Sequence, residues 1–228
     1  MTNLVLSALI VVSAMPGESR SPERIVDCNT VETYHDAIRI QIISEMELFQ
    51  VVCYLSGQYR GITSLDFEYK SEVEQRFGGY RNHPAVTVTK ELIRHHYAEN
   101  LIKAYILNDE FRDDTENLDL LHIEDGSEPK SNRDAKLRAI DGLREACRQF
   151  AHDSRFKEFY EKRKPYYLKK VQEVKTALEG LSVIAPREAF WGVKKDVYRI
   201  VIVLLEKDVH SCWFRNDGLR HSIYLLTP

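Results

Sequence analysis

The sequence lacks the residue patterns that mark the common catalytic sites. It contains no H-E-x-x-H helix for a catalytic zinc, no G-x-S-x-G nucleophile elbow and no Gly-rich phosphate loop. Its four cysteines include no C-x-x-C pair, which argues against a zinc ribbon or a thioredoxin-type redox site. No activity is therefore established by a motif, and whether the chain is an enzyme stays open.

An excess of positive charge is also missing. The chain has 32 Lys and Arg against 35 Asp and Glu, a net charge of −3. Binding of phosphate backbones needs clustered Lys and Arg, so we expect no nucleic acid as a partner. Acidic side chains dominate residues 109–128, where Arg112 is the only basic residue, and this composition is typical of a solvated loop.

No apolar run is long enough to span a bilayer, so no membrane span is expected in the mature chain. A short apolar run from Leu4 to Val12 is followed by Val12-Ser13-Ala14, which suits signal-peptidase cleavage after Ala14. We therefore interpret residues 1–14 as a signal peptide and 15–24 as a linker, which predicts export to the periplasm or cell envelope. The alternative is a buried first strand in a cytoplasmic protein, because no Lys or Arg precedes the run.

Apolar residues make up 43% of the chain, enough for the core of one domain over residues 25–228. Ile38 to Ile42 alternates apolar with polar residues, as a half-buried strand does. Ser44 and Glu47 then form an S-x-x-E pattern that predicts a capping box, and Gly57 predicts the end of that helix. The helix is apolar nearly all round, so it should lie inside the domain.

Further helices are expected along the middle of the chain. Their predicted ranges are 67–77, 85–107 opened by Pro84, one beginning at the N-cap Asn132, a short aromatic helix at 156–160, and one opened by Pro165 that runs to Gly180 with an apolar stripe from Leu168 to Leu181. Cys53 and Cys147 fall on apolar helix faces and are predicted to be buried thiols.

The last part of the chain has the pattern of strands. Residues 197–205 are an almost unbroken apolar run, and 209–214 and 221–226 flank a turn at Asn216-Asp217-Gly218. The fold class expected is α+β, mainly α: a helical bundle followed by a C-terminal antiparallel β-ribbon or small sheet over residues 197–226.

Two groups of side chains are weak candidates for metal ligands. His95 and Glu99 are i, i+4 neighbours on an expected helix, but an ordinary surface pair explains them as well. His210, Cys212 and His221 lie on the terminal strands, where partly buried polar residues are the alternative.

A basic, tyrosine-bearing segment over residues 157–175 is a candidate surface for an acidic partner. Its candidate contacts are Tyr166, Tyr167, Lys169 and Lys170. The alternative is a solvated helix face whose tyrosines pack inward.

Several segments together resemble a known family. They are Glu47-Leu48-Phe49 through Gly57, the run Phe77-Gly78-Gly79-Tyr80-Arg81-Asn82-His83-Pro84-Ala85-Val86, Phe150 through Tyr160, and Phe190-Trp191-Gly192 before the strand at 198–205. They resemble the domain of unknown function 4932 family, bacterial proteins of zinc-peptidase-like character, over most of residues 38–226.

The resemblance implies a function but no catalytic residue. Members of this kind carry an H-E-x-x-H type helix after the β-ribbon, and no such motif occurs here. The implied role is the scaffold part of a zinc metallopeptidase-like protein, truncated or degenerate and without peptidase activity of its own. Zinc is then expected only if the missing motif is supplied elsewhere, and the expected partner is a peptide or protein. His83 is expected to make a helix-entry hydrogen bond. The alternative is a non-catalytic binding or interaction module of the cell envelope.

Overall fold

The computed structural model describes seven stretches of the chain: residues 30–35, 38–57, 67–94, 130–192, 197–205, 210–216 and 219–226. Side chains are described within these stretches except at positions 34, 67, 130–137, 187, 191 and 197 and beyond residue 205.

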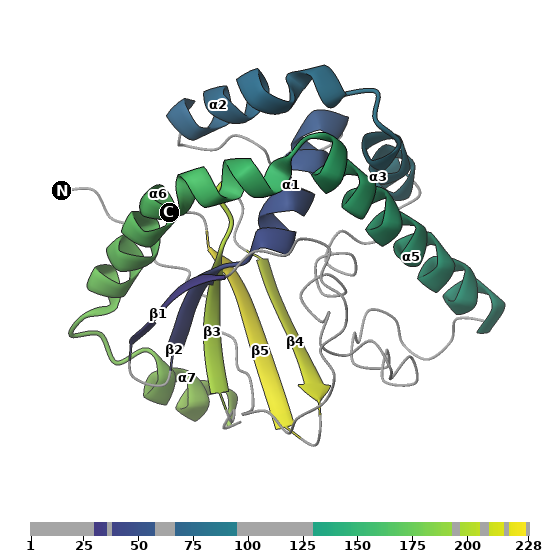
Figure 1. Ribbon diagram of the computed structural model, residues 1–228. Helices are drawn as coiled ribbons and strands as arrows, with labels where there is room; N and C mark the ends of the chain where they lie inside the picture. Colours follow the sequence, from purple (N-terminus) through teal and green to yellow (C-terminus); the bar gives the residue numbers. More distant parts are fainter. Residues whose placement is uncertain are drawn as a thin grey trace, which may run out of the picture.

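Five strands form one mixed sheet in the order β1-β2-β3-β5-β4 (Figure 1). Their bounds are β1 Val31–His35, β2 Ile38–Ile42, β3 Val197–Ile202, β4 His210–Asn216 and β5 Leu219–Leu226. The pairs β1–β2 and β4–β5 are antiparallel, whereas β2–β3 and β3–β5 are parallel. Because parallel neighbours need a long crossover, the helices between β2 and β3 serve as the connection within the sheet.

The helices are α1 Ser44–Ser56, α2 Phe67–Phe77, the 3-10 helix η1 Gly78–Tyr80, α3 Pro84–Arg94, α5 Lys130–Asp153, α6 Phe156–Leu178 and α7 Ile184–Trp191. In Figure 1, α1, α2, α3 and α5 gather beyond one end of the strands, and α6 extends from them toward β1. Helix α6 packs against β1 and β2 and thereby joins the helical layer to the sheet.

The core lies where α1 meets the other helices and the sheet. Every residue of α1 except Tyr54 is buried, and so are the inward positions of β2 and residues 198–205. Aromatic rings fill the space between α2, α5 and α6, with the Phe77 ring centroid 4.9 Å from that of Phe159 in an edge-to-face arrangement. Edge-to-face packing of this kind adds to the stabilisation that burial gives.

The expected fold class is confirmed as α+β, mainly α. The strand at Ile38–Ile42, the end of α1 at Gly57 and the helix start at Pro84 also stand as predicted. The terminal ribbon forms the antiparallel β4–β5 pair, but it belongs to a larger sheet because β5 also pairs with β3. Strand β1 had no clear periodic signal in the sequence.

The expected capping box at the start of α1 is wrong. The N-cap residue is Ile43, with no side-chain hydrogen bond, and Ser44 already lies in the helix. Ser44 Oγ donates to Glu45 Oε2 at 2.8 Å, and the Glu47 carboxylate accepts a hydrogen bond from Tyr69. Glu47 thus points into the core and does not reach back to the helix end.

Two other predicted helix boundaries are wrong. Helix α5 already includes Lys130, so Asn132 lies inside it and is not its N-cap. Pro165 does not open a new helix, because α6 runs through it from Phe156 to Leu178. A proline inside a helix costs roughly 3 kcal/mol, and the buried Tyr160 and Tyr167 on either side hold the helix together.

The apolar stripe expected on the second half of α6 is only partly inward. Val171, Val174 and Leu178 are buried, whereas Leu168 and Leu181 are 53% and 47% exposed. The predicted buried thiols Cys53 and Cys147 are confirmed as buried free cysteines.

The N-terminal segment 1–14, the linker 15–24 and the acidic stretch 109–128 lie outside the described residues. Within the described residues, no helix has both the length and the apolar character needed to cross a membrane.

Candidate functional site

A carboxyl group is buried among three helices. Glu47 of α1 is 1% exposed, and its Oε1 accepts a hydrogen bond from the hydroxyl of Tyr69 on α2. The Tyr69 hydroxyl is also 3.0 Å from that of Tyr167 on α6. The three side chains form a continuous chain of polar groups inside the core, in which each helix contributes one member.

The electrostatics of this chain follow from its burial. Loss of water raises the pKa of Glu47 to about 7, and the hydrogen bond from Tyr69 opposes that rise. Burial and the nearby Glu47 charge raise the pKa values of Tyr69 and Tyr167 well above the usual range, so both phenols stay protonated. Glu47 is therefore the one member of this trio that exchanges a proton near neutral pH.

Aromatic side chains close this chain off from solvent. The Tyr166 ring stacks on Tyr69 with centroids 5.4 Å apart, and the Tyr160 ring lies 4.9 Å from Tyr167. The Tyr160 hydroxyl donates to the carbonyl oxygen of Ile42 at 2.9 Å, which ties α6 to the end of β2. The Glu47 carboxyl is thus enclosed among side chains of α1, α2 and α6.

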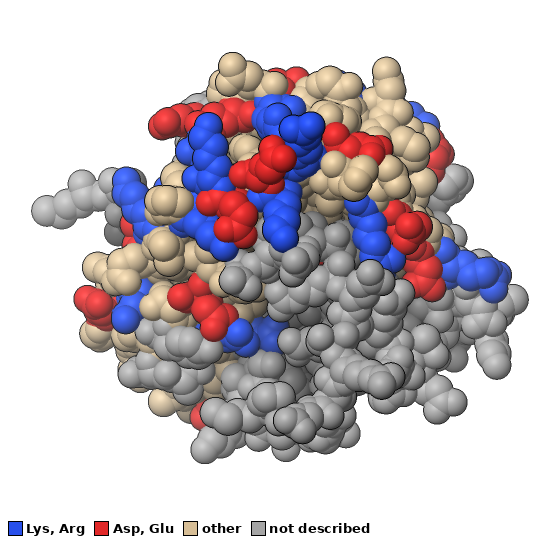
Figure 2. Space-filling model, viewed as in Figure 1, with Lys and Arg blue, Asp and Glu red and all other residues tan. Residues whose placement is uncertain are grey.

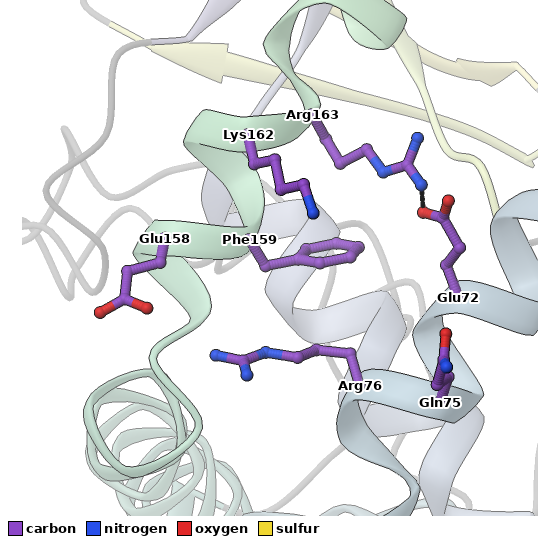
Figure 3. A pocket seen from close by; sticks show the side chains of 7 residues that line it. All are labelled: Glu72, Gln75, Arg76, Glu158, Phe159, Lys162 and Arg163. Atoms are coloured by element: carbon purple, nitrogen blue, oxygen red, sulfur yellow. Dashed lines mark ion pairs between the residues drawn. The ribbon is translucent and has the colours of Figure 1, made fainter.

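A second polar region lies on the outside of the same helices, in an open groove between α2 and α6. The groove has a cavity volume of about 410 Å³, and its lining residues are Glu72, Gln75, Arg76, Glu158, Phe159, Lys162 and Arg163. In Figure 3, Arg163 and Glu72 meet across the groove as an ion pair, and Phe159 lies between Lys162 and Arg76. In this groove, cationic side chains of α2 and α6 lie beside an aromatic ring.

The candidate partner-binding residues on α6 divide between interior and surface. Tyr167 is fully buried in the chain described above, and Tyr166 is half-buried with the Lys170 ammonium 5.5 Å from its ring centroid. Lys169 Nζ and Lys170 Nζ lie 3.8 Å and 3.3 Å from carboxylate oxygens of Glu173. Figure 2 shows Lys and Arg interspersed with Asp and Glu over α5 and α6, so neither sign of charge dominates this face. Partner binding through these residues stays a prediction.

The metal search covers only the side chains that the structure describes. Among those side chains, no three His, Cys, Asp or Glu lie close enough together to hold a metal ion. Metal binding by the five candidate residues stays a prediction, because the side chains of all five lie outside those that the structure describes. His95 and Glu99 lie outside the described residues.

The backbone register places the ribbon candidates on one face of the β4–β5 pair. His210 pairs with Leu225, Cys212 with Ile223 and Phe214 with His221. Residues two apart on a strand share a face, so all three candidate positions share one. His210 and His221 are four residues apart in register, about 13 Å along the strands, and Cys212 lies between them.

Among the described strands, β4 lies at one edge of the sheet. In the strand order, β4 pairs with β5 alone among the described strands, whereas β5 and β3 are each paired on both sides. At the opposite edge, β1 is packed against α6. Backbone groups on the outer side of β4 are therefore directed away from any described neighbouring strand, as are those of β1, against which α6 packs.

Sequence reasoning missed the Glu47 chain, although a usable signal was present. A helix that is apolar nearly all round is expected to be interior, and Glu47 lies within such a helix, so its carboxyl needed an interior partner. The expected role of His83 is confirmed, because its Nδ1 accepts a hydrogen bond from the Ala85 backbone N–H at 3.1 Å.

Comparison with known proteins gives a family without an assigned activity. No curated protein and no solved structure matches the chain. The model of one family, described as a domain of unknown function (DUF4932), matches residues 39–217. That range runs from β2 to the residue after β4 and covers well over half of the sequence. The chain therefore belongs to the DUF4932 family.

Proposed function

We propose that this chain is a peptide-binding scaffold of the metallopeptidase-like kind, in which the edge strand β4 takes an extended peptide by strand addition. The observation that carries the proposal is the position of β4 at the end of the strand order, with a partner on one side among the described strands. In an antiparallel pair, about half of the residues of a strand direct their N–H and C=O groups away from their neighbour. These groups are the ones an added peptide strand would bond.

The rest of the sheet supports such a role by holding β4 in place. Strand β5 is paired on both sides, and β3 next to it is buried and paired with β2. A peptide added to β4 would thus extend a sheet already fixed by the helical layer. The proposal is one of binding and not of hydrolysis, because the sequence contains no H-E-x-x-H motif.

Proline substitutions in β4 test this proposal. Ser211 and Cys212 are consecutive, so one directs its N–H toward β5 and the other directs it outward. Ser211→Pro and Cys212→Pro should therefore have different effects. The variant that loses an N–H directed toward β5 breaks the β4–β5 ladder and lowers thermal stability. The variant that loses an outward N–H keeps stability near wild type but abolishes peptide binding. Binding is measured as fluorescence polarisation of a labelled library of extended peptides, with and without a metal chelator.

The outcomes separate the proposal from its alternative. Binding that is insensitive to the chelator and lost in the stable proline variant supports the scaffold proposal. Binding that survives both proline variants but is lost in Lys169→Gln or Lys170→Gln would favour the non-catalytic interaction module on the α6 face. A wild-type chain that binds no peptide of the library contradicts the proposal.

We also propose that the protein is exported to the periplasm or cell envelope, on the basis of the apolar run Leu4 to Val12 and the Ala14 cleavage pattern. Mass spectrometry of the N-terminus of the protein expressed in secreting cells tests this. A chain that begins after Ala14 supports export, and an intact Met1 counts against it.

A further inference from the structure

The groove between α2 and α6 has charges that its own residues do not balance. Of its two carboxylates, Glu72 is paired with Arg163, and Figure 3 shows the Glu158 side chain directed away from the other lining residues. Among the residues that the structure describes, Lys162 has no ion-pair partner and Arg76 has no carboxylate partner; the Arg76 guanidinium donates one hydrogen bond to the Ser154 carbonyl oxygen at 3.0 Å. The groove therefore holds two cations without a matching anion.

The two cations are placed on opposite sides of an apolar wall. In Figure 3 the Lys162 ammonium lies on one side of the Phe159 ring, and the Arg76 guanidinium lies on the other, within the gap between the helices. Phe159 is held by its edge-to-face contact with Phe77 and is only 9% exposed. The hydrogen bond to Ser154 restricts the Arg76 side chain before any ligand binds. Less conformational entropy of this side chain is therefore lost on binding.

One ion pair within the groove indicates the kind of anion that its cations match. Arg163 already holds the carboxylate of Glu72 there, and the pair joins α6 to α2. Guanidinium groups match planar carboxylates with two parallel N–H donors. A cavity of about 410 Å³ lies within the size range of pockets that enclose small organic ligands.

From these observations we infer that the α2–α6 groove binds a small dicarboxylate, with one carboxylate on Arg76, the other on Lys162 and the carbon chain against Phe159. A free dicarboxylic amino acid derivative and a pair of acidic residues in a peptide share this chemistry. The site is separate from the β4 edge, so its binding does not depend on the function proposed above.

Isothermal titration of the full chain in low-salt buffer tests the inference. The probes are N-acetylglutamate, acetyl-Glu-Glu-amide, the neutral N-acetylglutamine amide and inorganic phosphate. N-acetylglutamate or acetyl-Glu-Glu-amide should bind, and the neutral amide should not. The tighter of the two acidic probes identifies the source as a free dicarboxylate or an acidic peptide.

Variants locate the binding in the groove. Lys162→Gln and Arg76→Gln should each weaken binding about tenfold, because each removes a charge-assisted hydrogen bond. Glu72→Gln should tighten binding, because it frees Arg163 for the ligand. Lys90→Gln is the matched control, since Lys90 is a lysine of α3 outside both the groove and the basic segment of α6. This variant should leave affinity within about twofold of wild type, because screened surface charges act weakly at a distance.

Three results would overturn the inference. The first is a wild-type chain that binds neither acidic probe at millimolar concentration. The second is an equal loss in Lys90→Gln and Lys162→Gln, which would indicate general charge attraction. The third is phosphate binding at least as tight as that of the dicarboxylates. Lys162 is exposed, so its variant tests binding even if Arg76→Gln disturbs the contact with Ser154, and the proline variants of β4 should leave this binding unchanged.

Discussion

Two glutamates on neighbouring helices lie in very different environments. Glu47 of α1 is buried against neutral phenols, and loss of water raises its pKa to about 7. Glu72 of α2 is partly exposed and pairs with the Arg163 guanidinium in the groove. A buried carboxyl carries a large desolvation cost and depends on its few partners, whereas a partly solvated ion pair is replaced at little cost by water.

This difference indicates which polar residues of the fold contribute to stability and which are available to bind a ligand. The interior chain from Glu47 through Tyr69 to Tyr167 joins α1, α2 and α6. The groove joins α2 and α6 again, but on the solvent side. We expect changes in the first region to alter stability and changes in the second to alter ligand binding.

The largest effect is expected for Glu47→Ala. The substitution removes a buried side chain and leaves the Tyr69 hydroxyl without its acceptor, so the free energy of unfolding should fall by about 2–4 kcal/mol. Urea denaturation at pH 6 measures it, with Glu72→Ala as the control on the neighbouring helix. A loss no larger than that of the control would break the comparison.

The next effect is a pH dependence that Glu47 confers on stability. Its folded-state pKa of about 7 lies above the ordinary value of 4.5, so the folded protein holds the proton more tightly than the unfolded chain. The resulting stabilisation is complete below pH 4.5 and is lost as the pH rises through 7, by an amount on the order of 3 kcal/mol.

Glu47→Gln isolates this contribution, because the amide keeps an acceptor for Tyr69 but does not titrate. The difference in unfolding free energy between wild type and Glu47→Gln should shift against the wild type between pH 5 and pH 8. A difference that is constant over this range would show that Glu47 does not change its proton affinity on folding.

The sequence predicted the elements of this fold better than their assembly. The strand at Ile38–Ile42, the interior helix ended by Gly57 and the strands β4 and β5 follow from local patterns of apolar residues and glycine. The parallel pairing of β2 with β3 joins residues about 160 positions apart, and no local pattern encodes such a partner. Pro165 was misjudged because burial of Tyr160 and Tyr167 outweighs a local helix-breaking preference.

The candidate sites were predicted less well for a related reason. Ser44 and Glu47 have the spacing of a capping box, but tertiary contact with Tyr69 takes the Glu47 carboxyl away from the helix end. The groove unites residues of α2 and α6 that lie about 90 positions apart, and single-sequence spacing cannot indicate that they face each other.

A smaller effect is expected for Tyr69→Phe, which removes one hydroxyl from the interior chain. The loss of its hydrogen bond should cost about 1–3 kcal/mol. Because that bond lowers the pKa of Glu47, its removal should raise this pKa further, so the cost should be greater at pH 8 than at pH 5. Tyr80→Phe is the matched control, since the Tyr80 hydroxyl donates to the Asp153 carbonyl oxygen at an exposed position. An equal loss of unfolding free energy at both pH values would show that the Tyr69 hydroxyl does not affect the pKa of Glu47.

The smallest effect is expected for Glu72→Gln in the groove. Its side chain and that of Arg163 are 31% and 23% exposed, and partly exposed ion pairs contribute less than about 1 kcal/mol, which salt reduces further. The change in unfolding free energy, measured by urea denaturation at low and high salt, should therefore be small and should shrink with salt. A loss of stability comparable to that of Glu47→Ala would mean that the ion pair in the groove holds α2 and α6 together as strongly as the interior contacts do. The main role of the groove residues would then be to stabilise the fold and not to bind a ligand. A small loss accompanied by tighter dicarboxylate binding would instead show that the two glutamates have different roles. Glu47 would then contribute to folding stability, and Glu72 would reduce the positive charge that the groove presents to an anion.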